Sequence, residues 1–568
     1  MIVLGISHDL WISSAAIVIN GKVKAAIAEE RLNRIKKYKG FPTLAVKYCL
    51  DNVGIKIDEV DLIVNGWNPA WHLEALNTRY SSQSRWRAEY LYSIPNNIIS
   101  IKDNFNLKET EQNFKGLGPK ITYIDHHLAH AAGSYYLSDY KNALFLVADG
   151  RGERHTATYG TCNNNKLKIL DTVNYPHSLG LFYSMITQFL GFIPDSDEWK
   201  VMALASHGTS KKNKFYKKIS KIINIDKNGK FRINLDYCGF HQPDVFGKKF
   251  YSEEFKKLVG ILPRKPDQKL TVEHKNLAWA CQKVFEETLF KILNKLHSQY
   301  RKNNLILSGG CFMNSVLNGK VLKNTPFKNV FIGPCPDDSG ISVGSALWGY
   351  YNRNPNSKRQ LNNHNYWGPE YKGQVEVILK KFKIKYSKLT KSWVTAAELL
   401  NRGKIIGWYQ GRTEFGQRAL GNRSILADPR NPKNKELVNR AVKYRESFRP
   451  FAPAILNEDV KKYFILEDEK IVKFMEKVFQ FKSFAKNKVP AVVHVDGSGR
   501  LQTVDIKSNK KFYLLIKHFK LLSGVPIILN TSFNLNGEPI VCTPNDAIRT
   551  FFSCGLDSLI IEDFLISK

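Results

Sequence analysis

The clearest pattern of hydrophobic and polar positions is a short unit that occurs twice in the first third of the chain. Residues 3–30 (VLGISHDLWISSAAIVINGKVKAAIAEE) predict a strand, a small polar loop, a second strand, a turn at Asn20 and Gly21, and a third strand. Residues 143–170 (ALFLVADGRGERHTATYGTCNNNKLKIL) predict the same succession, with the turn near Asn163–Asn165. Each unit is a β-meander whose first loop is small or polar enough to approach a phosphate group.

Two such meanders around one nucleotide are typical of the duplicated actin-like architecture, although many β proteins also contain meanders. Later segments add helices to the pattern. Residues 303–321 predict a buried strand, the pair Gly309 and Gly310, and a helix, while 331–350 predict a strand, a loop and a small-residue helix. Residues 172–206 predict an apolar helix followed by a polar loop that contains Glu198 and Lys200. Strands that alternate with helices in this way predict an α/β fold.

A polar, turn-rich stretch interrupts this pattern and predicts a domain boundary. We place a linker at 353–368, between a first domain at 1–352 and a second at 369–568. The second domain is expected to be α/β as well, with helices at 393–402 and 433–443 and strands at 404–409 and 525–529. The chain length of 568 residues also requires more than one core.

Composition narrows the class of protein. No apolar run approaches the ~18–20 residues of a membrane helix, so we expect no membrane insertion. The start reads as a strand rather than a secretory signal, and none of the eight cysteines forms a CxxC pair, so a cytoplasmic location is expected. The net charge of +34 suits an anionic partner or a solvated basic surface. Because the lysines are dispersed along the chain, we do not expect nucleic acid as the partner.

The segment DHHLAHAAGSYY (125–136) carries the first candidate chemistry. Asp125 is a suitable N-cap, so a helix is expected to start there and to place His126 and His130 one turn apart on the same face. His127 points about 100° away and is the weaker partner. Asp149, at a predicted strand end, would complete a two-histidine, one-carboxylate set that suits Fe(II) or another divalent metal. The alternative is a capped helix with surface histidines.

Other candidates are residues that bind anions. Gly309 and Gly310 would let the backbone approach a phosphate, or would simply form a tight turn. Asp337 or Asp338 would cap the following helix or face a metal. In the second domain, cations and amides among glycines favour an acyl- or nucleotidyl-phosphate pocket over plain surface loops. They are Arg412, Arg418, Arg423, Lys443, Arg445, Arg449, His494, Arg500, Asn530, Ser532 and Asn534.

Together these motifs resemble the O-carbamoyltransferases that modify nodulation factors and antibiotics (the NodU/CmcH family). The matching segments run almost the whole length in the family's order: AAIAEERLNRIKKYKGFP, DHHLAHAAGSYY, LVADGRGE, YPHSLGLFYSMITQFLGF, LSGGCFMN, GRTEFGQRALGNRSILADPR, FRPFAPAIL and NTSFNLNGEPIV. The resemblance implies an actin-like N-terminal domain similar to tRNA threonylcarbamoyl-adenosine synthases and a YrdC-like C-terminal domain. The latter would combine carbamoyl phosphate with ATP and Mg to give carbamoyl-AMP, and the former would transfer the carbamoyl group to a hydroxyl of the acceptor.

The resemblance also implies roles for individual residues. His126, His130, Asp149 and, as fourth ligand, Asp338 would bind the metal, and His8 would act as general base beside the catalytic His130. The nucleotide and carbamoyl phosphate contacts would be Lys200, Gly309, Gly310, Asn314, Arg418, Lys443, Arg449, Arg500, Asn530 and Ser532. The chain departs from the family pattern at Trp199 and at Cys311-Phe312-Met313, which leaves the shape of the pockets open.

Three competing functions stay open from the sequence. A tRNA threonylcarbamoyl-type transferase would use the basic charge, and an ATP-dependent sugar kinase would use the same duplicated fold. A non-catalytic nucleotide-binding scaffold is the third. The acceptor is expected to be a small molecule or glycan with a hydroxyl group, but its identity is not readable, and a homodimer is suggested by family analogy alone.

Overall fold

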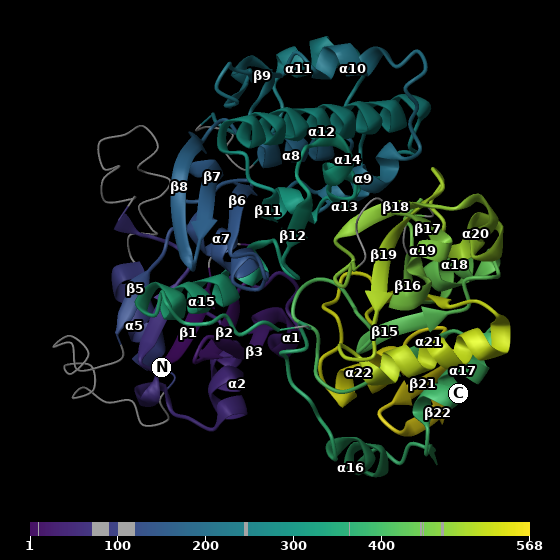
Figure 1. Cartoon of the computed structure of the whole chain (residues 1–568). Coiled ribbons are helices and arrows are strands. Elements are labelled where there is room, and N and C mark those ends of the chain that lie inside the picture. The colour runs from purple at the N-terminus through teal and green to yellow at the C-terminus, as the bar shows by residue number, and fades with distance from the viewer. Residues whose placement is uncertain are drawn as a thin grey trace.

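The computed structural model describes residues 1–8, 11–70, 90–99, 101, 120–242, 248–362, 364–443, 446, 448–466 and 471–568. Its helices and strands build a mixed α/β protein whose N-terminal part carries two five-stranded sheets and whose C-terminal part carries one large sheet (Figure 1). Among the described residues, no helix is both long and apolar enough to cross a membrane.

The first sheet begins with the predicted meander. Strands β1 to β3 are antiparallel neighbours, and the β2–β3 turn has Asn20 and Gly21 at positive φ, as a tight turn of this type requires. Strands β4 and β5 continue the sheet parallel to β1, giving the order β3-β2-β1-β4-β5. The bounds are β1 Ile2–Ser7, β2 Ser14–Ile19, β3 Lys22–Ala28, β4 Leu62–Asn65 and β5 Ile121–Tyr123.

The second sheet repeats this arrangement strand for strand. Strands β6 to β8 form the second meander, and β11 and β12 run parallel to β6, so that the order is β8-β7-β6-β11-β12. The repeat expected from residues 3–30 and 143–170 is therefore confirmed. The bounds are β6 Asn142–Ala148, β7 His155–Asn163, β8 Lys166–Asn174, β11 Asn304–Ser308 and β12 Asn329–Ile332.

Two helices fill the space between the sheets. Helices α7 (His126–Tyr135) and α15 (Ile341–Arg353) share one core cluster with side chains from β1, β2, β4, β6 and β11. The buried residues of α7 include Ala129, Ala131 and Ala132, whose small side chains let neighbouring elements approach the helix closely. The outer face of the first sheet is covered by α2 (Thr43–Val53) and α5 (Tyr90–Ile99), and that of the second by α8 (Leu179–Phe189) and α12 (Val272–Tyr300).

Smaller elements connect and surround these layers. One sequence expectation is wrong here, because Glu198 and Lys200 lie in helix α9 (Glu198–Ala205) and not in a loop. The helix expected after Gly309 and Gly310 is present as a 3₁₀ turn (Gly310–Met313) followed by the one-turn helix α13 (Ser315–Asn318). The remaining elements are α1 Glu29–Asn33, α10 Lys214–Ile219, β9 Ile223–Ile225, β10 Phe231–Ile233, α11 Glu253–Val259, α13 Ser315–Asn318 and α14 Val321–Asn324.

The C-terminal part is built on a ten-stranded sheet in the order β13-β22-β21-β14-β15-β20-β16-β19-β18-β17. Helices α17, α21 and α22 pack their apolar faces on it in one core cluster (Figure 1). The strands are β13 Ser387–Lys388, β14 Ile406–Tyr409, β15 Arg423–Ala427, β16 Ala452–Leu456, β17 Phe464–Ile465, β18 Lys477–Phe481, β19 Ser498–Val504, β20 Ile527–Ser532, β21 Ser558–Ile561 and β22 Phe564–Ser567. The helices are α16 Gln374–Lys381, α17 Ser392–Asn401, α18 Lys433–Val438, α19 Val460–Tyr463, α20 Ser483–Lys488, α21 Lys510–Ser523 and α22 Pro544–Phe552.

The elements predicted for this part are confirmed. Helix α17 matches 393–402, α18 and the π-helical turn Asn439–Lys443 match 433–443, and β14 and β20 match the two strands. Between α15 and α16, no described residue lies in a helix or strand. This connection is packed rather than loose, because Trp367 is buried in the core cluster between the N-terminal sheets. The domain limits 1–352 and 369–568 stay a prediction.

Candidate functional site

Helix α7 starts at His126, one residue after Asp125, as predicted, but its cap is different. The Asp125 side chain accepts no hydrogen bond from the first turn. Instead, Glu153 Oε1 accepts from the backbone N–H of His126 at 2.9 Å and from that of Asn68 at 2.7 Å. Glu153 lies in the loop between β6 and β7, so the start of α7 is fixed by the strand pair that also carries Asp149.

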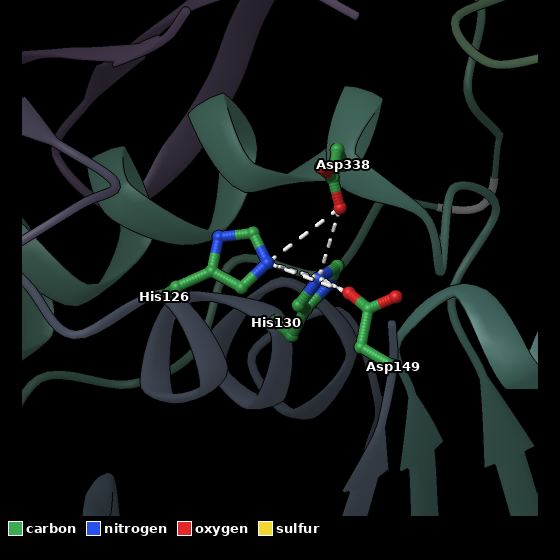
Figure 2. Close-up of side chains that lie close together, drawn as sticks. All are labelled: His126, His130, Asp149 and Asp338. Carbon is green, nitrogen blue, oxygen red and sulfur yellow. Dashed lines mark hydrogen bonds and ion pairs between the residues drawn. The ribbon is translucent and has the colours of Figure 1, made fainter. Parts of the chain in front are cut away.

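Four buried side chains converge beside this helix. Figure 2 shows the imidazoles of His126 and His130 pointing from α7 toward the carboxylates of Asp149, after β6, and Asp338, before α15. Each is at most 5% exposed. One ligand atom from each residue lies within 4.8 Å of those of the other three. The structure therefore brings together the four residues that the sequence analysis named as metal ligands.

The spacing of these atoms suits a single cation. His130 Nε2 lies 3.0 Å from Asp149 Oδ2, 3.4 Å from Asp338 Oδ1 and 3.1 Å from His126 Nε2. His126 Nε2 lies 3.4 Å and 3.6 Å from the same two carboxylate oxygens. Two donor atoms each ~2.1 Å from one ion are ~3.0 Å apart at a right angle and ~3.4 Å apart at a tetrahedral angle. The residues present could thus hold a divalent metal.

The electrostatics of the cluster point the same way. Burial disfavours charged His130, but its contacts with Asp149 and Asp338 outweigh burial and raise its pKa to about 9. Burial also acts against the Asp149 carboxylate, yet the two histidines hold its pKa well below its usual range. Two carboxylates in a buried pocket stabilise positive charge strongly, and a divalent cation satisfies this demand better than a proton does.

Two further histidines were considered from the sequence. His127 faces away from the cluster, as expected: its Nδ1 lies 2.8 Å from the Thr158 hydroxyl. His8 follows β1 and is buried, with its ring 5.5 Å from that of Phe41. Its chain neighbours reach the cluster, because Ser7 Oγ donates to the Asp338 carbonyl at 3.4 Å and the Trp11 N–H lies 3.4 Å from Asp338 Oδ2. The role of His8 as a base stays a prediction.

Gly309 and Gly310 lie where a larger side chain would collide with neighbouring atoms. A Cβ on Gly309, whose φ is +95°, would lie 2.3 Å from the Ala148 carbonyl oxygen. A Cβ on Gly310 would lie 2.8 Å from Asp149 Oδ1. These residues therefore allow β11 to pass close to the end of β6 and leave room for the carboxylate of Asp149. Asn314 caps α13 and exchanges hydrogen bonds with Gln282, so its side chain is already engaged.

Gly310→Ala should weaken metal binding without unfolding the protein. Residue 310 has an ordinary φ, but the added methyl group would displace the carboxylate of Asp149 by several tenths of an ångström. We expect about a tenfold loss of metal affinity, the size of effect seen when the support of a ligand is disturbed. Metal titration checks this. Gly150→Ala is the matched control because its Cβ would meet no atom within 4 Å, and equal metal affinity in both variants would contradict the prediction.

A cavity of about 720 Å³ connects the cluster with the C-terminal part of the chain. The N-terminal wall includes Asp149, Asp338 and Gly310. The predicted residues on the C-terminal wall are Arg418, Arg449, Arg500, Asn530, Ser532 and Asn534. The side chain of Lys443 and all of Arg445 lie outside the described part of the chain. The two groups of candidate residues, predicted on separate domains, thus face one common cavity.

The three arginines of GRTEFGQRALGNRS do not share one role, which corrects the sequence interpretation. Arg418 lines the cavity. Arg412 instead donates to the carbonyls of Trp367 and Gly368 in the connecting segment. Arg423 is fully buried, stacks 3.6 Å from the Tyr409 ring and donates to backbone carbonyls. Two of the three therefore stabilise the fold rather than bind a ligand.

Lys200, a predicted nucleotide contact, lies in a network that spans both walls of the cavity. Its Nζ is 2.9 Å from Asp197 and 3.3 Å from Glu446. Glu446 also pairs with Arg449, whose guanidinium lies 4.1 Å from the Trp199 ring centre. Trp199 therefore serves as the platform for Arg449.

Sequence reasoning missed one polar group of this wall. The Ser184 hydroxyl lies 2.9 Å from Asp195 Oδ1 and 2.7 Å from Glu198 Oε1. The hydroxyl has one proton, so it can donate to only one of the two carboxylates. Burial and the neighbouring Asp195 raise the pKa of Glu198 to about 7. The only sign of this group in the sequence was the D-x-x-E spacing of Asp195 and Glu198. This spacing is common in loops and therefore does not by itself indicate a functional group.

Comparison with known families accounts for both parts of the chain. A family model described as Carbamoyltransferase N-terminus matches residues 2–347, and one described as Carbamoyltransferase C-terminus matches residues 397–568. The first match contains all four residues of the buried cluster, and the second contains the predicted residues of the C-terminal cavity wall.

Individual relatives agree. Nodulation protein NolNO of Sinorhizobium fredii is 35% identical over 99% of this chain and 79% of its own length. The 3'-hydroxymethylcephem-O-carbamoyltransferase of Streptomyces clavuligerus is 32% identical over 43% of this chain and 45% of its own. Among solved structures, T. kodakarensis HypF covers 63% of this chain and 48% of its own at 14% identity and a TM-score of 0.31. The family predicted from the sequence motifs is thus confirmed by the models and the relatives.

Proposed function

Because the chain belongs to the carbamoyltransferase family, we propose that it transfers the carbamoyl group of carbamoyl phosphate to a hydroxyl group of a small natural product or glycan. The observation that carries this proposal is the common cavity. Asp149 and Asp338, the two carboxylates of the buried cluster, lie on one wall, and Arg418, Arg449 and Arg500 lie on the other. A phosphate-bearing donor and a site for charge stabilisation would therefore meet in one enclosed space.

We infer that the N-terminal domain has the actin-like fold and the C-terminal domain the YrdC-like fold. The two sheets of identical strand order support the first assignment, since a duplicated meander with two parallel strands is the unit of that architecture. The arginine-lined wall of the C-terminal sheet supports a carbamoyl phosphate and ATP site. ATP with Mg and a divalent metal, with Fe(II) as our candidate, are the cofactors we propose.

The proposed reaction has two steps that balance. In the C-terminal domain, carbamoyl phosphate, ATP and water would give carbamoyl-AMP, phosphate and pyrophosphate. In the N-terminal domain, the acceptor oxygen would form a bond to the carbamoyl carbon while the bond from that carbon to the phosphate oxygen breaks. AMP leaves with the electron pair, and the acceptor hydroxyl releases one proton. Carbamoyl-AMP does not have to leave the cavity between the two steps, which protects this intermediate from hydrolysis.

His126, His130, Asp149 and Asp338 are the residues that would hold the metal. A bound divalent metal supplies positive charge for the oxygen atoms that become negative during the transfer. His8 is the residue we assign to take the proton of the acceptor hydroxyl, because an imidazole side chain is the commonest general base in enzymes. The contacts of Ser7 and Trp11 with Asp338 support its location near the cluster.

A turnover screen tests the function. The protein is incubated with carbamoyl phosphate, ATP and a panel of hydroxyl-bearing acceptors, and products are identified by mass. We expect at least one acceptor to gain a carbamoyl group only when ATP and carbamoyl phosphate are both present. A product that gains a phosphoryl group instead would support the sugar kinase alternative, and carbamoylation without ATP would contradict the proposed intermediate.

A further inference from the structure

Arg31 is a buried cation that none of the roles above explains. It lies in α1, where the N-terminal and C-terminal parts of the chain face each other (Figure 1), and it lines the same cavity as Asp338 and Arg418. Its side chain is only 3% exposed. A guanidinium remains charged in proteins, so at this depth its N–H groups need partners.

The described partners leave one edge of the guanidinium unsatisfied. Nη2 donates to the carbonyl of Gly416 at 2.6 Å, which joins α1 to the loop that carries Arg418. The nearest carboxylate, Glu30, lies 3.9 Å from Nε, beyond hydrogen-bond range. Nη1 is buried and has no hydrogen-bond partner among the residues that the structure describes. Burial lowers the pKa of Arg31, although Glu30 and Glu414 act in the opposite direction.

A phosphate group is the ligand that this edge suits. Arginine prefers the paired oxygens of phosphate, and a charge-assisted bond to Nη1 would satisfy the orphan donor and neutralise the cation together. Asp337 and Asp338 are two carboxylates that line the same cavity. Both carboxylates are already engaged elsewhere. Asp337 accepts hydrogen bonds from Ser339 and Gln417, and Asp338 belongs to the buried cluster.

We propose that Nη1 of Arg31 binds a phosphate group of a substrate in the cavity, at the border between the two halves of the chain. This rests on the proposed function and names a residue for it. Two substrates carry such a group, carbamoyl phosphate and the AMP portion of the carbamoyl donor. In the transfer step, an Arg31 contact to AMP would stabilise the negative charge that this leaving group takes with the electron pair.

Arg31→Lys tests the proposal because lysine keeps the charge and can still donate to Gly416, but cannot make the second contact. We expect a dissociation constant for AMP about tenfold higher, measured by calorimetry, or an equal rise in the KM for carbamoyl phosphate. The first result identifies AMP as the ligand and the second identifies carbamoyl phosphate. Arg31→Gln keeps an amide donor but has no charge. It should therefore have a larger effect than Arg31→Lys on whichever of these two constants changes.

Arg34→Lys is the matched control. Arg34 follows α1, donates to the carbonyls of Pro539 and Ile540 across the same border, and does not line the cavity. If Arg31→Lys binds AMP and uses carbamoyl phosphate as Arg34→Lys does, the proposal is wrong. A wild-type protein that binds AMP but carbamoylates no acceptor would contradict the proposed function and leave the role of Arg31 standing. The two can be separated because the calorimetric measurement of AMP binding does not depend on turnover.

Discussion

Replacing His130 by alanine should abolish carbamoyl transfer while carbamoyl-AMP formation in the C-terminal domain continues. His130 Nε2 lies within 3.4 Å of three other members of the buried cluster, so its loss removes the central donor of the set. It would also leave Asp149 and Asp338 as two buried carboxylates with less compensation. We expect the metal to be lost and the transfer rate to fall at least about a thousandfold, the scale of a lost electrostatic stabiliser.

Three measurements on the same preparation separate the two steps. Metal content per chain reports the cluster, mass analysis of the acceptor reports transfer, and carbamoyl-phosphate-dependent release of pyrophosphate from ATP reports the first step. His127→Asn is the matched control, because His127 is the next buried histidine of α7 but faces Thr158 rather than the cluster. A His130→Ala protein that keeps both its metal and its transfer rate would refute the assignment.

The sequence could locate this cluster because its information is local. A four-residue spacing on a helix defines one face, and Asp149 follows directly on a strongly apolar strand. The choice between Asp337 and Asp338 was different, since adjacent residues of a loop point in directions that the pattern does not encode. Only the resemblance selected Asp338. The structure explains the difference, because Asp337 is held by Ser339 and Gln417 instead.

The fold was predictable to the same extent. The two meanders follow from alternating apolar positions and turn residues, but their assembly around α7 and α15 does not, because it depends on contacts between segments more than 300 residues apart, such as Ser14 with Ser342. The prediction that Asp125 caps α7 was wrong for a related reason. Glu153 reaches the helix start from a neighbouring loop and takes the position that local preference gave to Asp125.

The sequence interpretation was weakest for the arginines of the C-terminal part. Residue type and neighbouring glycines suggest an anion pocket, but a guanidinium binds carbonyl groups of the protein by the same hydrogen bonds. Arg418 and Arg423 are five residues apart, and the first lines the cavity while the second is enclosed in the fold. Sequence alone cannot separate the two cases, because the difference lies in which backbone carbonyls surround each side chain.

Arg423→Met should therefore destabilise the protein without a direct effect on substrate binding. Its guanidinium donates to the carbonyls of Gln410, Gly411 and Asn422, all within 3.0 Å, and stacks on Tyr409. Methionine fills similar volume but leaves these buried carbonyls without donors, each at a cost of ~1–3 kcal/mol that is partly offset because a buried charge is removed as well. We expect the free energy of unfolding to fall by about 3 kcal/mol, measured from the urea midpoint of the C-terminal transition.

Arg418→Met provides the matched comparison, since it removes the same side chain from the same segment. Arg418 has no hydrogen bond or ion pair among the described residues, so its loss should leave the urea midpoint within about 0.5 kcal/mol of the wild type. Its KM for carbamoyl phosphate or ATP should rise about tenfold or more, whereas folded Arg423→Met should keep the wild-type KM. Because each variant is expected to change one quantity and not the other, the opposite assignment of effects would show that the ligand-binding arginine is Arg423.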